Sequence, residues 1–527
     1  MNKIYNNFLN YAENNFKRNL SWLDRDIDSP TYGSFDRNYW HYKITDFNSD
    51  ILQQGLYTLI SLYRGDIPND YNKLRLRELI LASTKYTINS FKKKLFFNEY
   101  YPNEDGYPPL AFISNLLGDI FNEFPEFLDS DKISSIYKKI NLYLSTLTEV
   151  NASNQYAVGI SGLYKFLQFY PDLKIKINLN FHIKNLLKLQ NDIEGWFNEY
   201  DGFDLGYLSV TLEALSDIYE ISKEKRIILS IDKIIDFVYK IIDKDGELPF
   251  TINSRNTEYF LPYGLVKNLK RNSKCASILN LLFNKMNLRV HFIKGNDDRY
   301  HSHYIFASIL KSLPYLKEAN IVSEYDFTKY AEFASAGLLK KYFKKFDVTV
   351  FIGLKKGGII RIHDHKNKKI LIQNGFRALK NKKILTNNFQ NKNWKFEIKD
   401  NLISCEGYFI KTNFVISSPI KHFILRISSF LFGKKIIKFL KNFMIFNKIS
   451  KKHFFKRKIM IKDTLIVKDY FKGFRGYELK INPKQNLRHV ASANIFSEED
   501  FFEDIIKLNI KSIQQDTFET KNEFKFN

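Results

Sequence analysis

The sequence predicts a multidomain α and β protein, in which an all-helical, toroid-like domain precedes a β-rich domain. Three observations support this prediction. The chain has 527 residues, more than one hydrophobic core usually serves. Residues 1–340 repeat the apolar spacing of amphipathic helices. Alternating apolar residues, which are typical of strands, begin near residue 346.

Ten segments of the first domain carry apolar residues at intervals of three and four, which predicts ten helices. They are residues 50–63, 74–91, 110–127, 132–147, 156–169, 208–221, 227–242, 276–283, 304–316 and 325–343. Short breaks rich in Gly, Pro, Asn and Asp separate them, such as NEYDGFDLG and DKDGELPF. Serial helical hairpins of this kind close most easily as a superhelix or a toroid, which predicts a toroid domain over residues 1–340.

The second predicted domain, residues 346–500, is rich in β-branched and aromatic residues. The segments DVTVFIGL, GGIIRIH, WKFEIKD and GYFIKTNFVIS alternate as strands do, and the pattern returns in KRKIMIKDTLIVKDYF. A basic, helical insertion at about 421–450 therefore interrupts a sheet. Residues 501–527 are polar and charged, and we predict a tail with a short helix and a frayed end.

Composition excludes several classes of protein. A hydrophobic content of 44% and an aromatic content of 16% exclude global disorder. Cys275 and Cys405 lie in different predicted domains, so we expect neither a disulfide framework nor a thiolate metal site. The N-terminus lacks the pattern of a signal peptide, and no apolar stretch of about 18 residues occurs. The sequence predicts a cytoplasmic protein without a transmembrane helix, peripheral to a membrane at most.

The formal charge of +24 is concentrated in one stretch. Residues 407–462 contain no Asp or Glu but 14 Lys and Arg, at 411, 421, 426, 434, 435, 438, 441, 448, 451, 452, 456, 457, 458 and 462. This stretch is either the solvated face of a lysine-rich chain or a surface for a polyanion, such as an acidic polysaccharide or anionic lipid headgroups.

Nucleic acid is the least favoured of these partners, because no nucleic-acid-binding module accompanies the charges. In FLFGKKIIKFLKNFMIF, residues 430–446, apolar side chains recur at near-helical spacing with lysines between them. This pattern predicts a helix that lies either on a membrane surface or against another domain. An anionic membrane surface is therefore one expected partner of residues 421–458, beside an acidic polysaccharide or another domain of the chain, and no nucleic-acid partner is expected.

Five predicted loops hold side chains that stack on sugar rings or bind their hydroxyl and carboxylate groups. The first, residues 29–47, contains Tyr32, Arg37 and Trp40, and the second, NASNQY, opens a helix. The third contains Trp196, Glu199 and Tyr207; the fourth Arg255, Asn256 and Tyr259; the fifth Arg299, His301 and His303. All five lie at predicted helix ends, where a toroid can gather them. The structural alternatives are a helix N-cap for NASNQY and a core aromatic for Tyr207.

This sequence resembles the heparinase II/III-like polysaccharide lyases, whose chains pair an incomplete α/α toroid with an antiparallel β-sandwich. The resemblance covers the layout of most of the chain and a few motifs. In that family an Asn, usually followed by His, neutralises a uronate carboxylate, and a Tyr several dozen residues later abstracts and donates the proton. Asn154 matches the Asn, and Tyr207, 53 residues further on, matches the Tyr.

One position departs from the family pattern, because Gln155 stands where many members have His. A Gln can hydrogen-bond a carboxylate but carries no charge, so an Arg must contribute, and Arg255 and Arg299 are the candidates. The family also uses a late His, for which His301, His303, His363 and His365 are candidates. His363 and His365 on one strand would share a face, but with no third ligand evident we predict no metal site.

The resemblance implies a polysaccharide partner and a chemistry for the site. Cleavage of a 4-linked uronate by β-elimination removes the C5 proton while donors stabilise the charge on the carboxylate. One Tyr can act as base and then as acid when nearby cations lower its phenol pKa. The predicted catalytic residues are Asn154, Tyr207, Arg255, His301 and His303. The predicted substrate-binding residues are Gln155, Tyr32, Arg37, Trp40, Trp196, Glu199, Asn256, Tyr259 and Arg299, with no cofactor.

Two alternatives remain open at this point. A uronate C5-epimerase would share the proton abstraction and return the proton to the opposite face. A non-catalytic glycan-binding protein would keep the loops and lack the chemistry. A cytoplasmic protein fits the synthesis of a surface polysaccharide better than the digestion of an external one.

Overall fold

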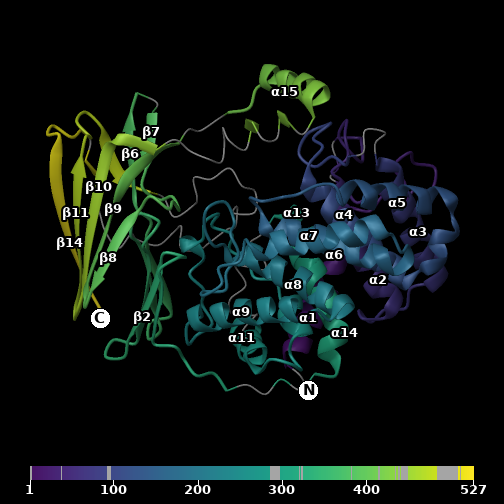
Figure 1. The fold of residues 1–527 in the computed structure, drawn as a ribbon, viewed down its shortest axis with the longest axis horizontal. Helices are drawn as coiled ribbons and strands as arrows, with labels where there is room; N and C mark the ends of the chain where they lie inside the picture. Colours follow the sequence, from purple (N-terminus) through teal and green to yellow (C-terminus); the bar gives the residue numbers. More distant parts are fainter. Residues whose placement is uncertain are drawn as a thin grey trace.

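The computed structural model describes the chain except residues 1–2, 37, 39, 92–95, 285–296, 320, 322–323, 382, 413–415, 434, 437–438, 441–448, 483–508, 511 and 527. Its helices form one part of the molecule and its two sheets the other (Figure 1). Among the described residues, none of the helices has the length and apolarity that crossing a bilayer requires.

The helical part contains an inner and an outer set of helices. The inner set is η1 (Asp50–Gly55), α2 (Leu56–Arg64), α4 (Tyr107–Glu123), α6 (Ser153–Phe169), α8 (Leu205–Ser222), α10 (Tyr263–Lys267) and α14 (Ala307–Lys317). The outer set is α1 (Lys3–Leu20), α3 (Lys73–Ser90), α5 (Asp131–Leu144), α7 (Leu173–Leu187), α9 (Lys225–Ile241) and α11 (Ser273–Phe283). Contacts run from α2 through η1, α4, α6, α8, α10 and α14 back to α2, so the inner set closes a ring.

The inner helices are buried on nearly every side, and their buried residues include polar as well as apolar side chains. In α8, for example, thirteen of the eighteen residues are buried. The outer helices bury one stripe each, as Ile231, Ile234 and Val238 of α9 do. Short elements complete this part: η2 (Pro125–Asp129), η3 (Phe250–Ile252), α13 (Asp298–Tyr300) and the π-helical turn η4 (His301–Phe306).

Two antiparallel sheets follow. The five-stranded sheet has the order β1-β2-β3-β4-β5, from Tyr330–Phe333, Leu338–Phe343, Val348–Gly353, Ile359–Asp364 and Lys369–Gln373. The nine-stranded sheet has the order β13-β12-β6-β7-β9-β10-β11-β14, with β8 beside β9. Its strands are β6 (Phe376–Lys380), β7 (Lys383–Thr386), β8 (Lys395–Lys399), β9 (Leu402–Thr412), β10 (Ile449–Ile461), β11 (Thr464–Lys472), β12 (Glu478–Ile481), β13 (Asn509–Ile510) and β14 (Thr517–Lys525).

The two sheets share an apolar core, to which Val350 and Ile360 contribute from the smaller sheet and Ile403 and Ile459 from the larger one. The fold class predicted from the sequence, a helical toroid followed by antiparallel sheets, is thereby confirmed. Helix α15 (Pro419–Phe432) forms the first part of the predicted basic insertion between β9 and β10, and in Figure 1 it lies over the helical part. The helix predicted over residues 430–446 lies partly outside the described residues.

The helix predicted over residues 325–343 is wrong, because the segment forms the hairpin of β1 and β2. Gly337 takes a positive φ of 70° in the turn, a conformation that a helix interior does not contain. The turn is held from the helical part, where the Glu194 carboxylate accepts the backbone N–H groups of Ser335 and Ala336 at 2.7 and 2.8 Å. The apolar spacing of this segment fits both structures, and the glycine decides between them.

The prediction for the C-terminal tail is also wrong over residues 517–525. This segment is strand β14, which pairs along its whole length with β11 and forms an edge of the larger sheet. Its alternating half-buried and exposed residues, TFETKNEFK, are the signal of a strand with one covered face. The segment is rich in charged residues because one of its faces is exposed to solvent. Charged side chains on an edge strand oppose its pairing with a strand of another chain.

One cation of the basic stretch is not at the surface. Arg457 on β10 is fully buried and forms two parallel hydrogen bonds of 2.7 and 2.8 Å with the Asp469 carboxylate on β11. Its guanidinium also donates to the Gly358 carbonyl at 3.0 Å. Arg457 therefore fixes the register of two strands and is unable to bind a polyanion, which corrects the prediction for this residue.

Candidate functional site

The first turn of α6 is held by a buried carboxylate from a distant loop. Glu199 Oε1 accepts three hydrogen bonds: from Ser153 Oγ at 2.6 Å, from the Asn154 backbone N–H at 2.7 Å and from Asn154 Nδ2 at 3.0 Å. Ala152 at the N-cap has no capping side chain, so Glu199 takes over this role. The contact fixes the Asn154 side chain at the positive end of the α6 dipole.

Burial dominates the protonation of Glu199. It raises the pKa of the fully buried carboxyl from 4.5 to about 8, in spite of the donors of Ser153 and Asn154. The group therefore carries a proton at neutral pH. Three side-chain oxygens of this turn, Asn154 Oδ1, Gln155 Oε1 and Glu199 Oε2, have no hydrogen-bond partner among the described residues. Buried polar atoms of this kind are rare and indicate a place where a ligand or water binds.

The first turn of α8 is held by a second buried carboxylate, Asp204, at its N-cap. Asp204 Oδ1 accepts the Tyr207 backbone N–H at 3.2 Å, and Asp204 Oδ2 accepts the Arg255 backbone N–H at 3.0 Å. The Thr257 hydroxyl also donates to Oδ1. One carboxylate thus joins the helix that carries Tyr207 to the loop that carries Arg255.

The loop of Arg255 is further supported from both of its sides. Ser254 Oγ donates to the Glu199 carbonyl at 2.7 Å, which connects it to the α6 turn. Lys356, from the turn between β3 and β4, donates to the Thr251 and Asn253 carbonyls at 2.8 and 2.6 Å and to Asn256 Oδ1. The Arg255 guanidinium lies over the Tyr200 ring at 4.7 Å. The sheets therefore help to shape the site although its residues belong to the helical part.

A run of aromatic rings leads from Tyr207 to the fifth predicted loop. The ring of Tyr259 lies 6.4 Å from that of Tyr207 and 5.9 Å from that of Tyr304, and Tyr304 stacks on Tyr300 at 5.7 Å. His303 contacts this run at 4.3 Å from Tyr304. Burial lowers the pKa of His303 to about 3, so its ring is neutral at neutral pH.

His301 points away from this run. Its ring lies 5.8 Å from that of Tyr11 on α1 and stacks on Phe306 at 5.1 Å, inside the apolar core. Burial lowers its pKa to about 4. Of the two histidines predicted to be catalytic, the structure connects His303 with Tyr259 and Tyr207 and places His301 beside α1.

The fifth predicted loop forms an ion pair with Glu99, and Ser49 connects this pair to Asp36 of the first predicted loop. Arg299 donates to Glu99 Oε1 at 2.8 Å and to Ser49 Oγ at 3.4 Å, and its guanidinium lies 4.3 Å from the Tyr100 ring. The Ser49 backbone N–H in turn donates to Asp36 Oδ2 at 2.7 Å. Burial lowers the pKa of Arg299, but the charge of Glu99 outweighs it and raises the pKa above its ordinary value. Arg299 therefore keeps its positive charge, and the Glu99 carboxylate balances that charge within the protein.

Four other predicted binding residues differ widely in their surroundings. Tyr32 is half-buried, with its hydroxyl 3.4 Å from Arg75, and Trp40 is exposed beside His41. Trp196 is buried and donates to Glu194 at 2.7 Å, near the hairpin of the sheets. Asn256 accepts from Lys356. Arg37 lies outside the described residues.

His363 and His365 lie at the junction between the helices and the smaller sheet. His363 Nδ1 hydrogen-bonds the Asp243 carboxylate, and His365 Nδ1 lies 2.8 Å from Asp245. Both histidines therefore join the two parts of the protein. In the part of the chain that the structure describes, no group of three or more His, Cys, Asp or Glu residues is arranged to hold a metal ion.

Glu199→Gln is expected to change how stability depends on pH. Between pH 4.5 and 8, Glu199 is deprotonated in the unfolded chain and protonated in the folded protein. The free energy of unfolding therefore falls by up to about 1.4 kcal/mol for each pH unit in this range. Gln removes this cost. The unfolding temperature of the variant minus that of the wild type should increase from pH 5 to about pH 8. A difference that stays constant with pH would contradict the assignment.

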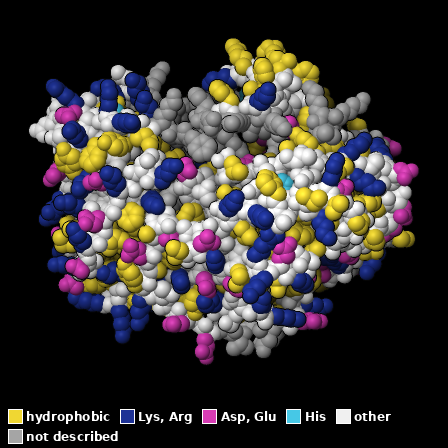
Figure 2. All heavy atoms as spheres, viewed as in Figure 1, with side chains coloured by type: hydrophobic (Ala, Val, Ile, Leu, Met, Phe, Trp, Pro, Cys, Tyr) yellow, Lys and Arg dark blue, Asp and Glu magenta, His cyan; other side chains and the backbone are white. Residues whose placement is uncertain are grey.

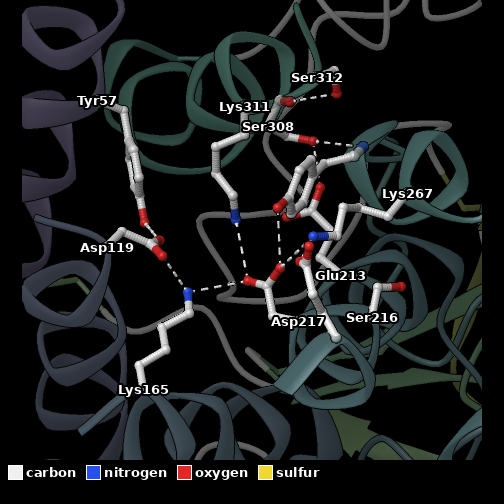
Figure 3. A network of polar contacts seen from close by, with 12 residues as sticks. Tyr57, Asp119, Lys165, Glu213, Ser216, Asp217, Lys267, Ser308, Lys311 and Ser312 are labelled. Carbon is white, nitrogen blue, oxygen red and sulfur yellow. Dashed lines mark hydrogen bonds and ion pairs between the residues drawn. The ribbon is translucent and has the colours of Figure 1, made fainter. Parts of the chain in front are cut away.

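A second polar cluster, which the sequence did not reveal, lies further along the same inner helices (Figure 3). Asp119, Lys165 and Asp217 each lie thirteen residues into α4, α6 and α8. Lys165 Nζ lies 2.6 Å from Asp119 and 3.1 Å from Asp217. At a rise of about 1.5 Å per residue, the cluster is about 15 Å from Asn154 and Tyr207 along the helices.

Hydroxyl groups and two further lysines complete this cluster. Tyr57 donates to Asp119 at 2.6 Å and Tyr263 donates to Asp217 at 3.0 Å. Lys267 and Lys311 each approach Asp217 to 3.9 Å. Burial raises the pKa of Asp217, but the three lysines outweigh it and hold the pKa below its ordinary value. The sequence does contain a signal for this cluster, because each of the three helices carries a charged residue among mostly apolar ones. A charged side chain that is buried has to be paired, so such residues indicate a buried ion pair.

The comparisons with known proteins concern the fold. No family model matches this chain, and no curated protein matches it in sequence. A chondroitin AC lyase of Streptomyces coelicolor A3, in complex with chondroitin sulphate, superposes with a TM-score of 0.54 at 9% identity, over 90% of this chain and 67% of that one. A tyrosine-to-alanine mutant of that lyase gives 0.51 at 10% identity with the same coverage.

A smaller protein superposes less well. Cellobiose 2-epimerase from Bacillus thermoamylovorans gives a TM-score of 0.41 at 12% identity, over 60% of this chain and 100% of that one. Identities this low establish the fold and nothing further. The chain is thus similar in fold, over most of its length, to a polysaccharide lyase with a helical toroid and antiparallel sheets.

Proposed function

We propose that this protein is a β-eliminating lyase that acts on an acidic, uronate-containing polysaccharide. The observation that carries the proposal is the Asp204 carboxylate, which binds the backbone of both Tyr207 and Arg255. Together with Glu199, which holds Asn154, it fixes a base, a cation and an amide in one connected framework. These are the three kinds of group that the elimination requires.

In the proposed reaction, the uronate carboxylate is bound by Arg255, Asn154 and Gln155. Arg255 supplies the positive charge that Gln155 lacks. Rotation of the Gln155 amide would bring its N–H₂ group to the place of the unpartnered Oε1, so that it can donate to the sugar. Asn154 Nδ2 gives one N–H to Glu199, and its second N–H is the proposed donor to the uronate carboxylate. Donors at the carboxylate stabilise the charge that develops when the C5 proton leaves.

Tyr207 is the proposed base and acid. Its phenolate takes the C5 proton, the electron pair of the C5–H bond forms the C4–C5 double bond, and the C4–O4 bond breaks. The phenol then returns the proton to O4 of the leaving sugar. His303, which reaches Tyr207 through Tyr304 and Tyr259, completes the proposed catalytic set.

The predicted substrate-binding residues and partners belong to the same proposal. Asn256 and Tyr259 adjoin the framework described above. The Arg299 carbonyl hydrogen-bonds the His303 ring, and Tyr32 and Trp40 lie on the first loop. We also propose that the protein is related to the heparinase II/III-like lyases. Its proposed role is in the synthesis of a surface polysaccharide, and its proposed second partner is an anionic membrane surface.

The test is ultraviolet absorbance during incubation of the purified protein with a panel of acidic polysaccharides. A rise in the absorbance of the unsaturated uronate supports the lyase, and carboxyl-reduced forms of the same polymers are the control that should give none. Incorporation of solvent deuterium at C5 without a rise would indicate an epimerase. Binding with neither signal would indicate a glycan-binding protein.

A further inference from the structure

Helix α15 exposes its apolar face to solvent. Six side chains of this face are between 45% and 73% exposed: Ile420, Phe423, Ile424, Ile427, Phe430 and Leu431. Their spacing of three and four residues places them on one side of the helix. In Figure 2 they form the hydrophobic patch at the top of the molecule. A helix of a globular protein normally turns such a face inward.

The polar side of α15 is the side that holds it to the protein. Ser429 is the buried residue of the helix, and its hydroxyl donates to the Pro102 carbonyl at 2.9 Å. Arg426 forms an ion pair with Asp46, with Nη2 at 3.1 Å from Oδ1. The helix is therefore fixed on the helical part by its polar residues, with its apolar residues directed outward.

The loop that contacts α15 through Asp46 also exposes apolar side chains. Trp40 and Tyr42 precede Asp46 on this loop and are 85% and 67% exposed. Trp and Tyr are the residues that favour the boundary between water and lipid, because they combine an apolar ring with a polar group. Two segments that meet at the Arg426–Asp46 ion pair thus both expose apolar side chains.

The charge of the segment determines which partner fits this face. No Asp or Glu occurs in residues 407–462. Lys421 in the first turn of the helix and Lys435, three residues beyond its end, are both exposed. A second copy of the chain would bring like charges together. An anionic bilayer offsets them and at the same time covers the apolar side chains.

We infer that α15 docks the protein on an anionic lipid bilayer, with its apolar face at the boundary between headgroups and acyl chains. Docking also orients the candidate site. The loop of Pro102 carries Glu99 and Tyr100, which hold Arg299, and the ring run from Tyr300 leads to Tyr207. The end of the toroid with Tyr207 therefore faces the lipid surface. It follows, on the basis of the proposed function, that the polysaccharide is carried on that surface.

The first experiment measures sedimentation of the full chain with vesicles of phosphatidylcholine and phosphatidylglycerol, without substrate. We expect binding that weakens at about 1 M salt, where the screening length falls to about 3 Å, and weak binding to phosphatidylcholine alone. Phe423→Ser with Phe430→Ser should weaken binding by about tenfold for each side chain. The control, Leu173→Ser with Ile177→Ser on α7, changes two equally exposed apolar residues and should bind as the wild type does.

Binding that the Phe423→Ser, Phe430→Ser variant retains would overturn the inference, as would the absence of binding to anionic vesicles. A dimer that this variant dissociates, seen by sedimentation equilibrium without vesicle binding, would assign the face to a second copy instead. Fluorescence supplies an independent readout, because a blue shift on binding that Trp40→Phe removes would place Trp40 at the lipid surface.

The second experiment compares turnover of soluble chondroitin with that of chondroitin conjugated to a phospholipid in the same vesicles. We expect the conjugate to be cleaved at least tenfold faster by the wild type, and the α15 variant to lose this advantage while cleaving the soluble polymer normally. Equal rates for the two forms would overturn the orientation. Vesicle binding with no cleavage of either form would refute the proposed function and leave the docking in place.

Discussion

Tyr207→Phe is expected to lower kcat for cleavage of an acidic polysaccharide by about 10³-fold or more, because the substitution removes both the base and the acid of the elimination. The ring is retained, so its contact with Tyr259 at 6.4 Å persists and KM should change little. Initial rates from ultraviolet absorbance at several substrate concentrations separate the two parameters.

Tyr137→Phe is the matched control for this prediction. Tyr137 lies on the outer helix α5, is fully buried, and has a hydroxyl without a hydrogen-bond partner among the described residues. Its substitution should leave kcat unchanged. If Tyr207→Phe retains more than about a tenth of the wild-type kcat at every pH, Tyr207 is not the base.

Lys165→Met is expected to destabilise the helical part by about 3–5 kcal/mol, because it leaves the buried Asp217 and its neighbour Asp119 without their central cation. Burial lowers the pKa of Lys165, but Asp119 and Asp217 outweigh it and raise it to about 12. The stabilisation from Lys165 is therefore complete below pH 10.5 and lost only as the pH approaches 12. Thermal unfolding followed by circular dichroism at neutral pH measures the effect.

Lys233→Met is the control for this second prediction. Lys233 forms an exposed ion pair with Asp192 at 3.2 Å, and the loss of such a pair should cost less than about 1 kcal/mol. Addition of Asp217→Leu to Lys165→Met should recover part of the loss, since it removes the carboxylate that was left unpaired. Equal unfolding temperatures for Lys165→Met and Lys233→Met would contradict a buried ion pair.

The fold was predictable where a repeating pattern had one structural interpretation. Apolar spacing over residues 208–221 and 227–242 predicted α8 and α9, because a long segment with period 3.6 has no strand that fits it. Segments with two interpretations were predicted wrongly. Residues 325–343 fit a helix and a hairpin equally well, and residues 517–525 resembled a tail because an edge strand is polar on one side.

The candidate site was only partly predictable, because its framework depends on contacts between distant loops. Asn154 and Tyr207 were predicted from the resemblance to the heparinase II/III-like lyases, but the sequence does not show that Glu199 and Asp204 would hold them. Nothing in the sequence indicated that Arg299 is neutralised by Glu99, which lies 200 residues away. Pairing of this kind arises only when the toroid brings the ends of its helices together.

The position of α15 in the chain has a consequence for how the protein can vary. Strands β9 and β10 are neighbours in the sheet, and Ile410 pairs with Ile449, so the two ends of the insertion lie opposite each other. A tight turn can join these strands directly, with the register of Cys405 and Arg457 unchanged. Replacement of the insertion by such a turn therefore requires no change in the pairing of β9 with β10.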